Sequence, residues 1–179
     1  MKVSREQVAE NREAILKAAG QLFREKGFDA VGVAEVMNAA GFTHGGFYGH
    51  FRSKDDLIAQ TLAYLLEKAS GDFDFKPFVD RYLSAAHRDN AATGCPTAAL
   101  AAATRQQSAA AREAMTSAQR GHIDRLSGKV EGKRAAARRR AAIGSWSAMV
   151  GAMILARSVD DSEFADEIIK ETRAWINAK

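Results

Sequence analysis

Few residues in this sequence have the types and spacing that catalysis or metal binding requires. The paired acids Asp55-Asp56 and Asp160-Asp161 are adjacent in sequence, so the two carboxylates of each pair cannot share a helix face. His87 and His122 lack a second histidine at ligand spacing, and a single cysteine, Cys95, excludes an intrachain disulfide and a cysteine-cluster zinc site. There is also no nucleophile–base pair and no phosphate-binding loop, so we expect no enzyme, no metal site and no cofactor.

Cys95 is the residue with the most reactive setting. It directly precedes Pro96, and proline favours the first position of a helix, so Cys95 is expected at the helix N-cap. Free backbone N–H groups and the positive end of the helix dipole favour thiol reactivity there, which would suit a sensor of oxidants or electrophiles. The alternative is a small residue packed in a helix-entry turn.

The composition indicates a globular, all-α chain. It has 179 residues, of which 46% are hydrophobic and 27% are charged, so a packed core is expected. Alanine makes up about a fifth of the sequence, and no segment alternates as a strand does. The charge-free stretch 141–156 is shorter than the roughly 20 residues that span a bilayer, and the N-terminus lacks an apolar signal region. We therefore expect no membrane contact and a cytoplasmic location.

Apolar periodicity and breaker residues predict about nine helices. Ser4 with Gln7 has the form of a capping box, Gly27 should end the first helix, and Thr43 and Ser53 should cap the third and fourth. The expected helices cover residues 5–26, 33–40, 44–50, 54–70, 75–87, 96–107, 109–126, 131–157 and 162–178.

Net charge alone does not establish nucleic-acid binding. The net charge is +4, but residues 1–54 hold eight Lys and Arg against six Asp and Glu, so the excess is not concentrated there. The run 133–140 is strongly basic, yet a solvated start of a long helix explains it more simply than an acidic partner does. A DNA-binding function must therefore be argued from geometry.

That geometry is a helix-turn-helix at about residues 33–51. Two short helices, 33–40 and 44–50, are joined by the turn Gly41-Phe42-Thr43. The second helix is too short to add much to a core, and its outward positions are polar, small or aromatic. A short helix standing proud of a small bundle has the shape that enters the major groove of DNA.

The segment GFTHGGFYGHFRSKDDL at residues 41–57 resembles the TetR family of bacterial repressors. The resemblance extends upstream to Ile15-Leu16, Ala18-Ala19, Leu22-Phe23 and Gly27-Phe28. It is strong over about residues 10–66 and only architectural beyond them. It implies a DNA-binding domain at 1–53 and a helical domain at 54–179 that binds a small effector and dimerises.

The resemblance also implies which residues contact DNA. Phe47 and Phe51 point inward and hold the recognition helix, Tyr48 reaches a phosphate or a thymine methyl, and His50 contacts a phosphate. As an alternative, Tyr48 and His50 are ordinary surface residues of a helical scaffold. Seven residues in or beside the helix are implied in DNA contact: Thr43, His44, Gly45, Gly46, Tyr48, His50 and Lys54.

The sequence departs from the family pattern in and near the recognition helix. Gly32 stands where a capping Ser or Thr is common, and His44 stands where Lys is common. Gly45, Gly46 and Gly49 place three glycines in one short helix, each costing about 1 kcal/mol relative to alanine in a helix. We expect a helix that is marginal alone, lets the backbone approach DNA closely and becomes fully ordered on the operator.

Later helices supply the expected effector and dimer residues. Gly and Ser interleaved with large apolar residues on the long helix permit close helix packing, which favours a dimer interface over a cavity lining. The expected cavity lining is Tyr64, Phe78, Tyr82, Cys95, Met115 and Trp146. The expected dimer interface is Trp146, Met149, Val150, Met153, Ile154, Phe164, Ile168 and Trp175.

These observations together predict a dimeric transcriptional repressor. It would bind a palindromic operator, with half-sites about 34–36 Å apart, and a small-molecule inducer or a thiol-modifying signal would release it. Within the same class, the alternative is an activator or a DNA-binding protein that responds to no ligand. In a different class, it is a helical protein-interaction bundle.

Overall fold

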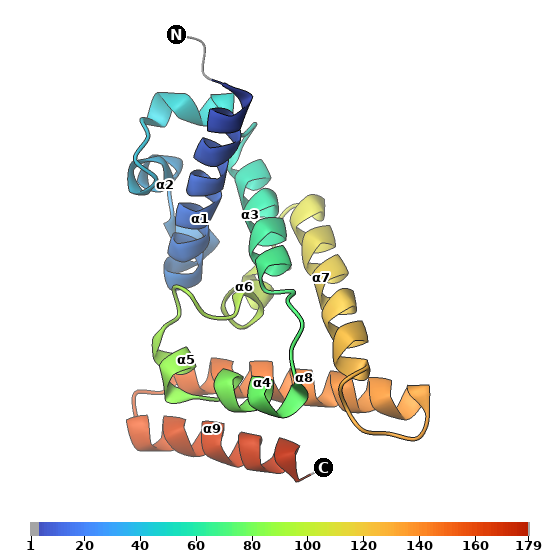
Figure 1. The fold of residues 1–179 in the computed structure, drawn as a ribbon. Coiled ribbons are helices and arrows are strands. Elements are labelled where there is room, and N and C mark those ends of the chain that lie inside the picture. The colour runs from blue at the N-terminus through green and yellow to red at the C-terminus, as the bar shows by residue number, and fades with distance from the viewer. Residues whose placement is uncertain (1–3, 179) are drawn as a thin grey trace.

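The computed structural model describes residues 4–178, which form helices joined by turns and loops, with no strand (Figure 1). The all-α prediction is confirmed. Nine of the ten helices are α-helical and one, η1, is a 3-10 helix. In chain order they are α1 (Arg5–Ala30), α2 (Val33–Ala39), η1 (His44–Gly49), α3 (Lys54–Lys68), α4 (Phe75–Tyr82), α5 (Ala85–Asp89), α6 (Pro96–Thr104), α7 (Ala109–Ser127), α8 (Ala135–Ser158) and α9 (Ser162–Asn177).

The extra helix arises because the helix expected at 75–87 is two helices. Leu83 leaves the helical conformation, with φ −89° and ψ 68°, and its side chain is fully buried. Ser84 has an extended backbone and caps the start of the next helix, because its Oγ accepts a hydrogen bond from the His87 N–H at 3.2 Å. Burial of Leu83 and capping by Ser84 thus divide the segment into α4 and α5.

The long helix also begins later than expected, at Ala135 instead of residue 131. Gly132 has φ +153°, a conformation that side-chain-bearing residues rarely adopt. The Arg138 guanidinium then donates to the Gly132 carbonyl at 3.1 Å. This bond fixes the loop against the first turn of α8.

Three local predictions near the N-terminus are confirmed. Gly27 takes φ +80° and interrupts α1, so that Phe28 folds back onto Phe23 with ring centroids 5.3 Å apart. Ser53 caps α3, its Oγ accepting from the Asp56 N–H at 3.1 Å. Ser4 caps α1 in the same way through the Gln7 N–H. The Gln7 side chain bonds Glu10 and Asn11, so the reciprocal half of a capping box is not formed.

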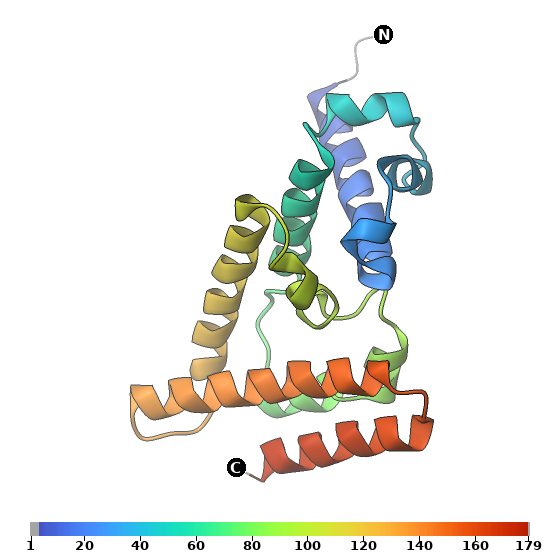
Figure 2. The same ribbon diagram turned by 180° about the vertical axis from the view of Figure 1, so that it is seen from behind.

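The helices form two ends with a connecting layer between them (Figures 1 and 2). α1, α2, η1 and the start of α3 make one end. α8 and α9 pack side by side across the other end, with α4 against α9. α7 packs along α3 and meets α8, while α6 lies between α1 and α7.

Two hydrophobic clusters correspond to these ends. The first joins α1, α2, η1 and α3 to residues of α6 and α7 such as Leu100 and Met115. The second joins α4, α8 and α9 to the C-terminal half of α7, including Leu126. α3 therefore packs with the N-terminal helices, and the division into 1–53 and 54–179 stays a prediction. Among the described helices none is both long and apolar enough to cross a membrane.

Candidate DNA-binding surface and effector cavity

Two buried phenylalanines hold the recognition segment against the N-terminal cluster. Phe47 and Phe51 are 1% and 2% exposed, and their rings stack with centroids 5.7 Å apart. Between them Tyr48 is 74% exposed, the most exposed large hydrophobic side chain in residues 4–178. Since η1 is anchored from one side only, its other side is presented to solvent, as the helix-turn-helix interpretation requires.

The recognition helix differs in type from the α-helix expected there. Its backbone forms i→i+3 bonds, such as Gly46 N–H to the Thr43 carbonyl at 3.0 Å and His50 N–H to the Phe47 carbonyl at 2.9 Å. The Thr43 side chain makes no capping bond to the first turn, contrary to expectation. The glycines explain the geometry, because they give the helix neither α-helical propensity nor side-chain packing.

The seven residues predicted to contact DNA lie in or directly beside this segment. Thr43, His44, Gly45 and Gly46 are exposed at its N-terminal end. His50 is half-buried at its C-terminal end, packed between the Phe42 and Phe51 rings, and its Nδ1 has no hydrogen-bond partner in the described residues. Lys54 is the first residue of α3, with Nζ 3.4 Å from the Asp29 carbonyl. One continuous surface thus contains the predicted set.

The glycines of this segment have different structural requirements. Gly41 lies in the turn with φ +82°, where a Cβ would be strained although no atom lies within 4 Å of it. Gly45 and Gly49 have ordinary φ values and equally open surroundings. Gly41 is therefore required by the turn itself, whereas Gly45 and Gly49 are not required by the fold of the free protein.

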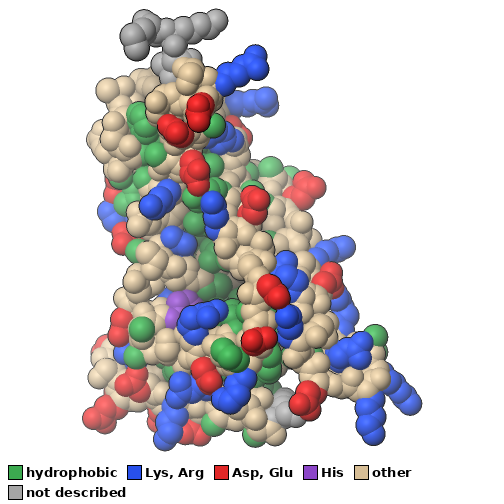
Figure 3. Space-filling model, viewed as in Figure 1, with side chains coloured by type: hydrophobic (Ala, Val, Ile, Leu, Met, Phe, Trp, Pro, Cys, Tyr) green, Lys and Arg blue, Asp and Glu red, His purple; other side chains and the backbone are tan. Residues whose placement is uncertain are grey.

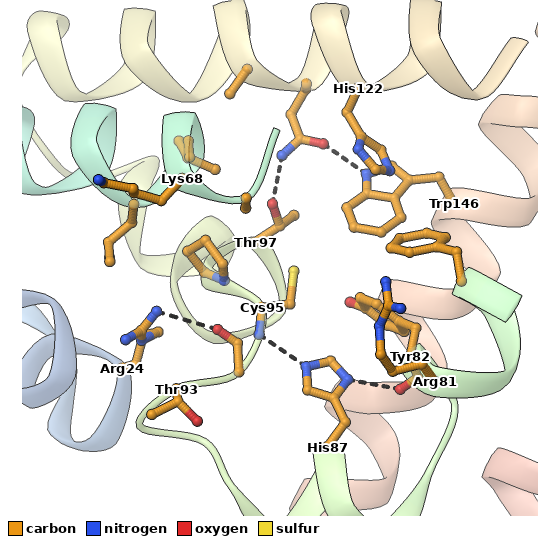
Figure 4. A pocket seen from close by; sticks show the side chains of 18 of the residues that line it. Arg24, Lys68, Arg81, Tyr82, His87, Thr93, Cys95, Thr97, His122 and Trp146 are labelled. Carbon is orange, nitrogen blue, oxygen red and sulfur yellow. Dashed lines mark hydrogen bonds between the residues drawn. The ribbon is translucent and has the colours of Figure 1, made fainter. Parts of the chain in front are cut away.

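A second feature is a cavity of about 420 Å³ between the two ends of the molecule. In the space-filling view it lies behind a hollow with a histidine at its edge (Figure 3). Four of the six predicted ligand residues line it: Phe78, Tyr82, Cys95 and Trp146 (Figure 4). Tyr64 instead donates to Glu13 on the surface at 3.1 Å, and Met115 belongs to the N-terminal cluster.

An aromatic cluster forms one wall of the cavity. It consists of Phe78, Tyr82, His122 and Trp146, and Phe73, which is outside the lining, stacks on Phe78. The His122 and Trp146 rings are 4.0 Å apart between centroids. Burial and, to a smaller extent, nearby Arg125 lower the pKa of His122 to about 4, so this imidazole is neutral at pH 7.

Hydrogen bonds join three helices across the cavity. Trp146 Nε1 on α8 donates to Gln119 Oε1 on α7 at 2.8 Å. Gln119 Nε2 donates in turn to Thr97 Oγ1 on α6, also at 2.8 Å. These bonds fix the orientation of the indole at the cavity wall and couple α6 to the end formed by α8 and α9.

Cys95 lies at the N-cap of α6, as predicted, and His87 fixes its backbone. His87 Nδ1 lies 2.7 Å from the Tyr82 carbonyl and its Nε2 accepts from the Cys95 N–H at 2.9 Å, which together define one neutral tautomer. Burial lowers the pKa of His87, which favours that neutral form. The Arg157 guanidinium caps α5 through the His87 and Arg88 carbonyls at 2.6 and 3.0 Å.

The predicted dimer residues lie on two different faces of α8 and α9. Trp146, Met149 and Met153 face inward and are 8%, 0% and 0% exposed. Their place is therefore the subunit's own core. Of the remaining five, Ile154, Phe164 and Trp175 are at least 42% exposed, whereas Val150 and Ile168 are half-buried and pack against the second hydrophobic cluster.

The sequence interpretation missed several polar residues of the cavity. Gln119, His122 and Arg125 recur every three residues on α7, beside the buried Ile123 and Leu126. That polar stripe next to an apolar one was a usable signal. Arg24 on α1 gave none, because a charged residue beside an apolar helix face is typical of a solvated surface.

The fold and the exposed recognition segment define an all-α helix-turn-helix protein. Residues 15–61 match the family described as bacterial regulatory proteins, tetR family. The crystal structure of the reduced form of Escherichia coli NemR aligns with a TM-score of 0.75 and 21% identity, covering 94% of this chain and 96% of that one. The N-terminal end of the chain thus matches the TetR family, and the fold of 94% of the chain is similar to that of NemR.

Most curated relatives are similar to this chain over a short stretch, and one is similar over most of its length. The HTH-type transcriptional repressor NemR of Escherichia coli is 28% identical over 138 residues, which cover 70% of this chain and 69% of NemR. The HTH-type transcriptional regulator AcrR of Shigella flexneri is 35% identical over 57 residues, or 32% of this chain. The chain spans only 26% of AcrR's length. These relatives are named as transcriptional regulators.

Alanine at the two kinds of glycine should have opposite effects on stability. We expect Gly45→Ala to raise the free energy of unfolding by about 0.4–1 kcal/mol, because it restricts the unfolded chain without strain. Gly41→Ala should lower it by about 1 kcal/mol or more, because its φ is left-handed. Urea unfolding followed by circular dichroism measures both, and effects of the same sign would contradict the assigned turn.

The neutral buried His122 predicts a specific loss of stability in acid. Its pKa of about 4 in the folded protein lies below the ordinary 6.5, so the unfolded chain binds the proton more readily. Stability should fall as the pH drops from 6.5 towards 4, and His122→Gln should fall less. His44→Gln, at an exposed site, should behave as the wild type in urea unfolding at each pH. Identical profiles for all three proteins would refute the assignment.

Proposed function

We propose that this chain is a dimeric transcriptional repressor that binds a palindromic operator and leaves it when a small molecule fills the cavity. The observation that carries the proposal is the one-sided anchoring of η1. Phe47 and Phe51 are buried, while Tyr48 between them is 74% exposed. The helix that carries Phe47 and Tyr48, η1, lies at the end of the molecule remote from α8 and α9 (Figure 2). A rigidly held, outward-facing short helix is what major-groove reading requires.

The proposed DNA contacts follow from the chemistry of the exposed groups. The Thr43 hydroxyl makes no bond to the first turn, so it is available to a phosphate. His44, Gly45 and Gly46 would face base edges or the backbone, with no side chain at the glycines to keep the strand away. Tyr48 would reach a phosphate or a thymine methyl.

Phosphate contacts would supply much of the affinity. Lys54 lies at the N-terminus of α3, where the helix dipole and its ammonium both favour a phosphate. His50 would contact a second phosphate from the C-terminal end of η1, where its side chain is half-buried. Because such contacts release counterions, binding should weaken steeply with salt.

The exposed side of α8 and α9 is the proposed dimer interface. Ile154, Phe164 and Trp175 are large apolar side chains left 42%, 48% and 50% exposed there. Gly151 and Ser147, on the outer side of α8, allow a second helix to approach closely. Two copies related by a two-fold axis would form a four-helix bundle and place two recognition helices on one operator.

The cavity lies where a ligand could change the relation between these two functions. It is bounded by α3 from the DNA-binding end and by α4, α7 and α8 from the proposed dimer end. An inducer that fits one arrangement of these helices better than the other would lower operator affinity, and the operator would weaken inducer binding by the same factor.

A thiol-modifying signal at Cys95 is a second proposed route to release. The thiol lines the cavity at the helix N-cap, so a small oxidant or electrophile that enters would meet it (Figure 4). A Cys95→Ser variant separates this route from reversible binding, because only the covalent response depends on sulfur.

The alternative functions predict different results in DNA-binding measurements. An activator, or a DNA-binding protein without a ligand, would show no effector-dependent change in affinity. A helical interaction bundle would lack sequence-selective binding to DNA. We propose a cytoplasmic regulator and not an enzyme, since the relatives are named as regulators and the exposed chemistry is that of DNA contact.

Selection of duplexes from a random DNA pool tests the function directly. We expect the wild type to enrich a palindrome, and Tyr48→Ala combined with Lys54→Ala to lose that enrichment. Lys170→Ala, an exposed charge on α9, is the matched control and should select the wild-type sequence. Failure of the wild type to enrich any sequence at low salt would refute the DNA-binding proposal and favour an interaction bundle.

A charge on the exposed side of α8 should separate the proposed dimer. We expect Ile154→Glu to sediment as a monomer, because a carboxylate would be desolvated at the centre of the interface. Val8→Glu introduces the same charge at a site of similar exposure on α1 and should leave the mass unchanged. A dimeric Ile154→Glu protein at micromolar concentration would place the interface elsewhere.

A further inference from the structure

The cavity carries positive charge that its lining does not neutralise. Four cationic side chains line it, from α1, α3, α4 and α7: Arg24, Lys68, Arg81 and Arg125. The lining, all within the described part of the chain, includes neither Asp nor Glu. Lys68 has an outside partner in Glu13 at 3.4 Å, and Arg81 stacks over the Phe78 ring. Arg24 and Arg125 have no carboxylate partner within hydrogen-bonding distance among residues 4–178.

Arg24 is partly buried without the partner that a buried charge normally has. Its Nη1 makes one long bond, 3.4 Å to the Gly94 carbonyl, and its Nε is buried with no hydrogen-bond partner in the described residues. Burial lowers the pKa of Arg24, which reflects the cost of holding this charge away from water. The Nε of Arg125 is buried and unpartnered in the same way. Buried guanidinium groups bind carboxylates in a bidentate geometry, and none is supplied here.

A buried hydroxyl adds an independent observation. Tyr82 is 6% exposed and lines the cavity; its OH has no nitrogen or oxygen partner among the described residues, and the Cys95 thiol is the polar group beside it. Burial raises the pKa of Tyr82 well above its ordinary value, so the hydroxyl keeps its proton and remains a donor. These unpartnered hydrogen-bond donors would be satisfied by a ligand rich in acceptors.

Two of the four cations lie across the cavity from the aromatic wall, whereas Arg81 lies beside that wall, next to Tyr82 (Figure 4). Arg24 and Lys68 lie on one side, and Tyr82, His122 and Trp146 lie on the other, with Cys95 and Thr97 between them. Trp146 is fixed by its bond to Gln119, so its ring is a preformed surface for stacking. A space of about 420 Å³ lies within the usual range for small-molecule sites.

We propose that the cavity binds a planar aromatic carboxylate. Its carboxylate would be held by Arg24, and its ring would lie against the wall formed by Tyr82, His122 and Trp146. Calling this ligand the effector rests on the proposed function, but the binding itself does not require DNA.

Arg24 also gives the ligand a route to the DNA-binding end. It is the only lining residue that belongs to α1, α2 or η1, and it ties α1 to Gly94 just before α6. A carboxylate that draws the guanidinium into the cavity would break this long bond. The ligand would thereby loosen α1 from the loop that precedes α6.

Calorimetry with matched acids and amides tests the proposal on the whole chain. The probes are benzoate, cinnamate and 1-naphthoate, each compared with its neutral amide of the same shape. We expect at least one acid to bind, and to bind at least tenfold more tightly than its amide, because only the acid offers a charged partner to Arg24.

Substitution of Arg24 assigns the preference to this residue. Arg24→Gln should remove the acid's advantage and leave amide binding unchanged, whereas Arg24→Lys should keep part of it. Arg105→Gln removes an exposed charge directly after α6, outside the cavity, and should bind as the wild type does. Circular dichroism confirms that each variant is folded.

The wild type alone can overturn the proposal. If no acid binds more tightly than its amide, the cavity does not select an anion, whatever the variants do. Equal loss of acid and amide binding in Arg24→Gln would make Arg24 a structural residue only. These titrations contain no DNA, so an absent operator preference would refute the proposed function and leave this result standing.

Discussion

The structure of the recognition segment depends on the burial of two rings, Phe47 and Phe51. Full burial of a phenylalanine is worth about 1.5–3 kcal/mol, whereas each glycine in the segment costs about 0.5–1 kcal/mol relative to alanine. The two rings therefore offset the three glycines, although little local preference remains for an α-helix. The segment is a 3-10 helix whose position is fixed by the two rings that it buries in the N-terminal cluster. The orientation of every exposed group on the segment, Tyr48 above all, is therefore determined by the burial of these two rings.

The two hydrophobic clusters explain where the cavity can exist. α3 and the N-terminal half of α7 pack in the first cluster, and the C-terminal half of α7 packs in the second. Neither cluster fills the region between them, where Leu65 and Leu66 of the first cluster and Trp146 of the second line the cavity together with polar side chains. The bonds from Trp146 through Gln119 to Thr97 hold this region open without filling it. A ligand site at the junction of two separately packed parts needs no strained element to create it.

The fold and the recognition segment were largely predictable from the sequence, and the cavity only in part. Breakers and caps such as Gly27 and Ser53 act locally, so their effects can be read from neighbouring residues. The end of α4 depends on the burial of Leu83, a tertiary effect with no local signal. α8 is apolar around most of its circumference, so periodicity could not tell Met149, which is buried, from Ile154, which is exposed. Arg24 reaches the cavity because α1 packs against α6, a tertiary contact that has no local signal in the sequence.

The absence of any Asp or Glu from the cavity lining affects which compounds the cavity would reject. The face of a tryptophan ring attracts amines and quaternary ammonium compounds through cation–π interactions, and a cavity with a carboxylate would hold them. Here the guanidinium groups of Arg24 and Arg125 would repel such cations in a region of low dielectric constant. Selectivity against cationic compounds would therefore come from repulsion, without a single contact dedicated to rejecting them.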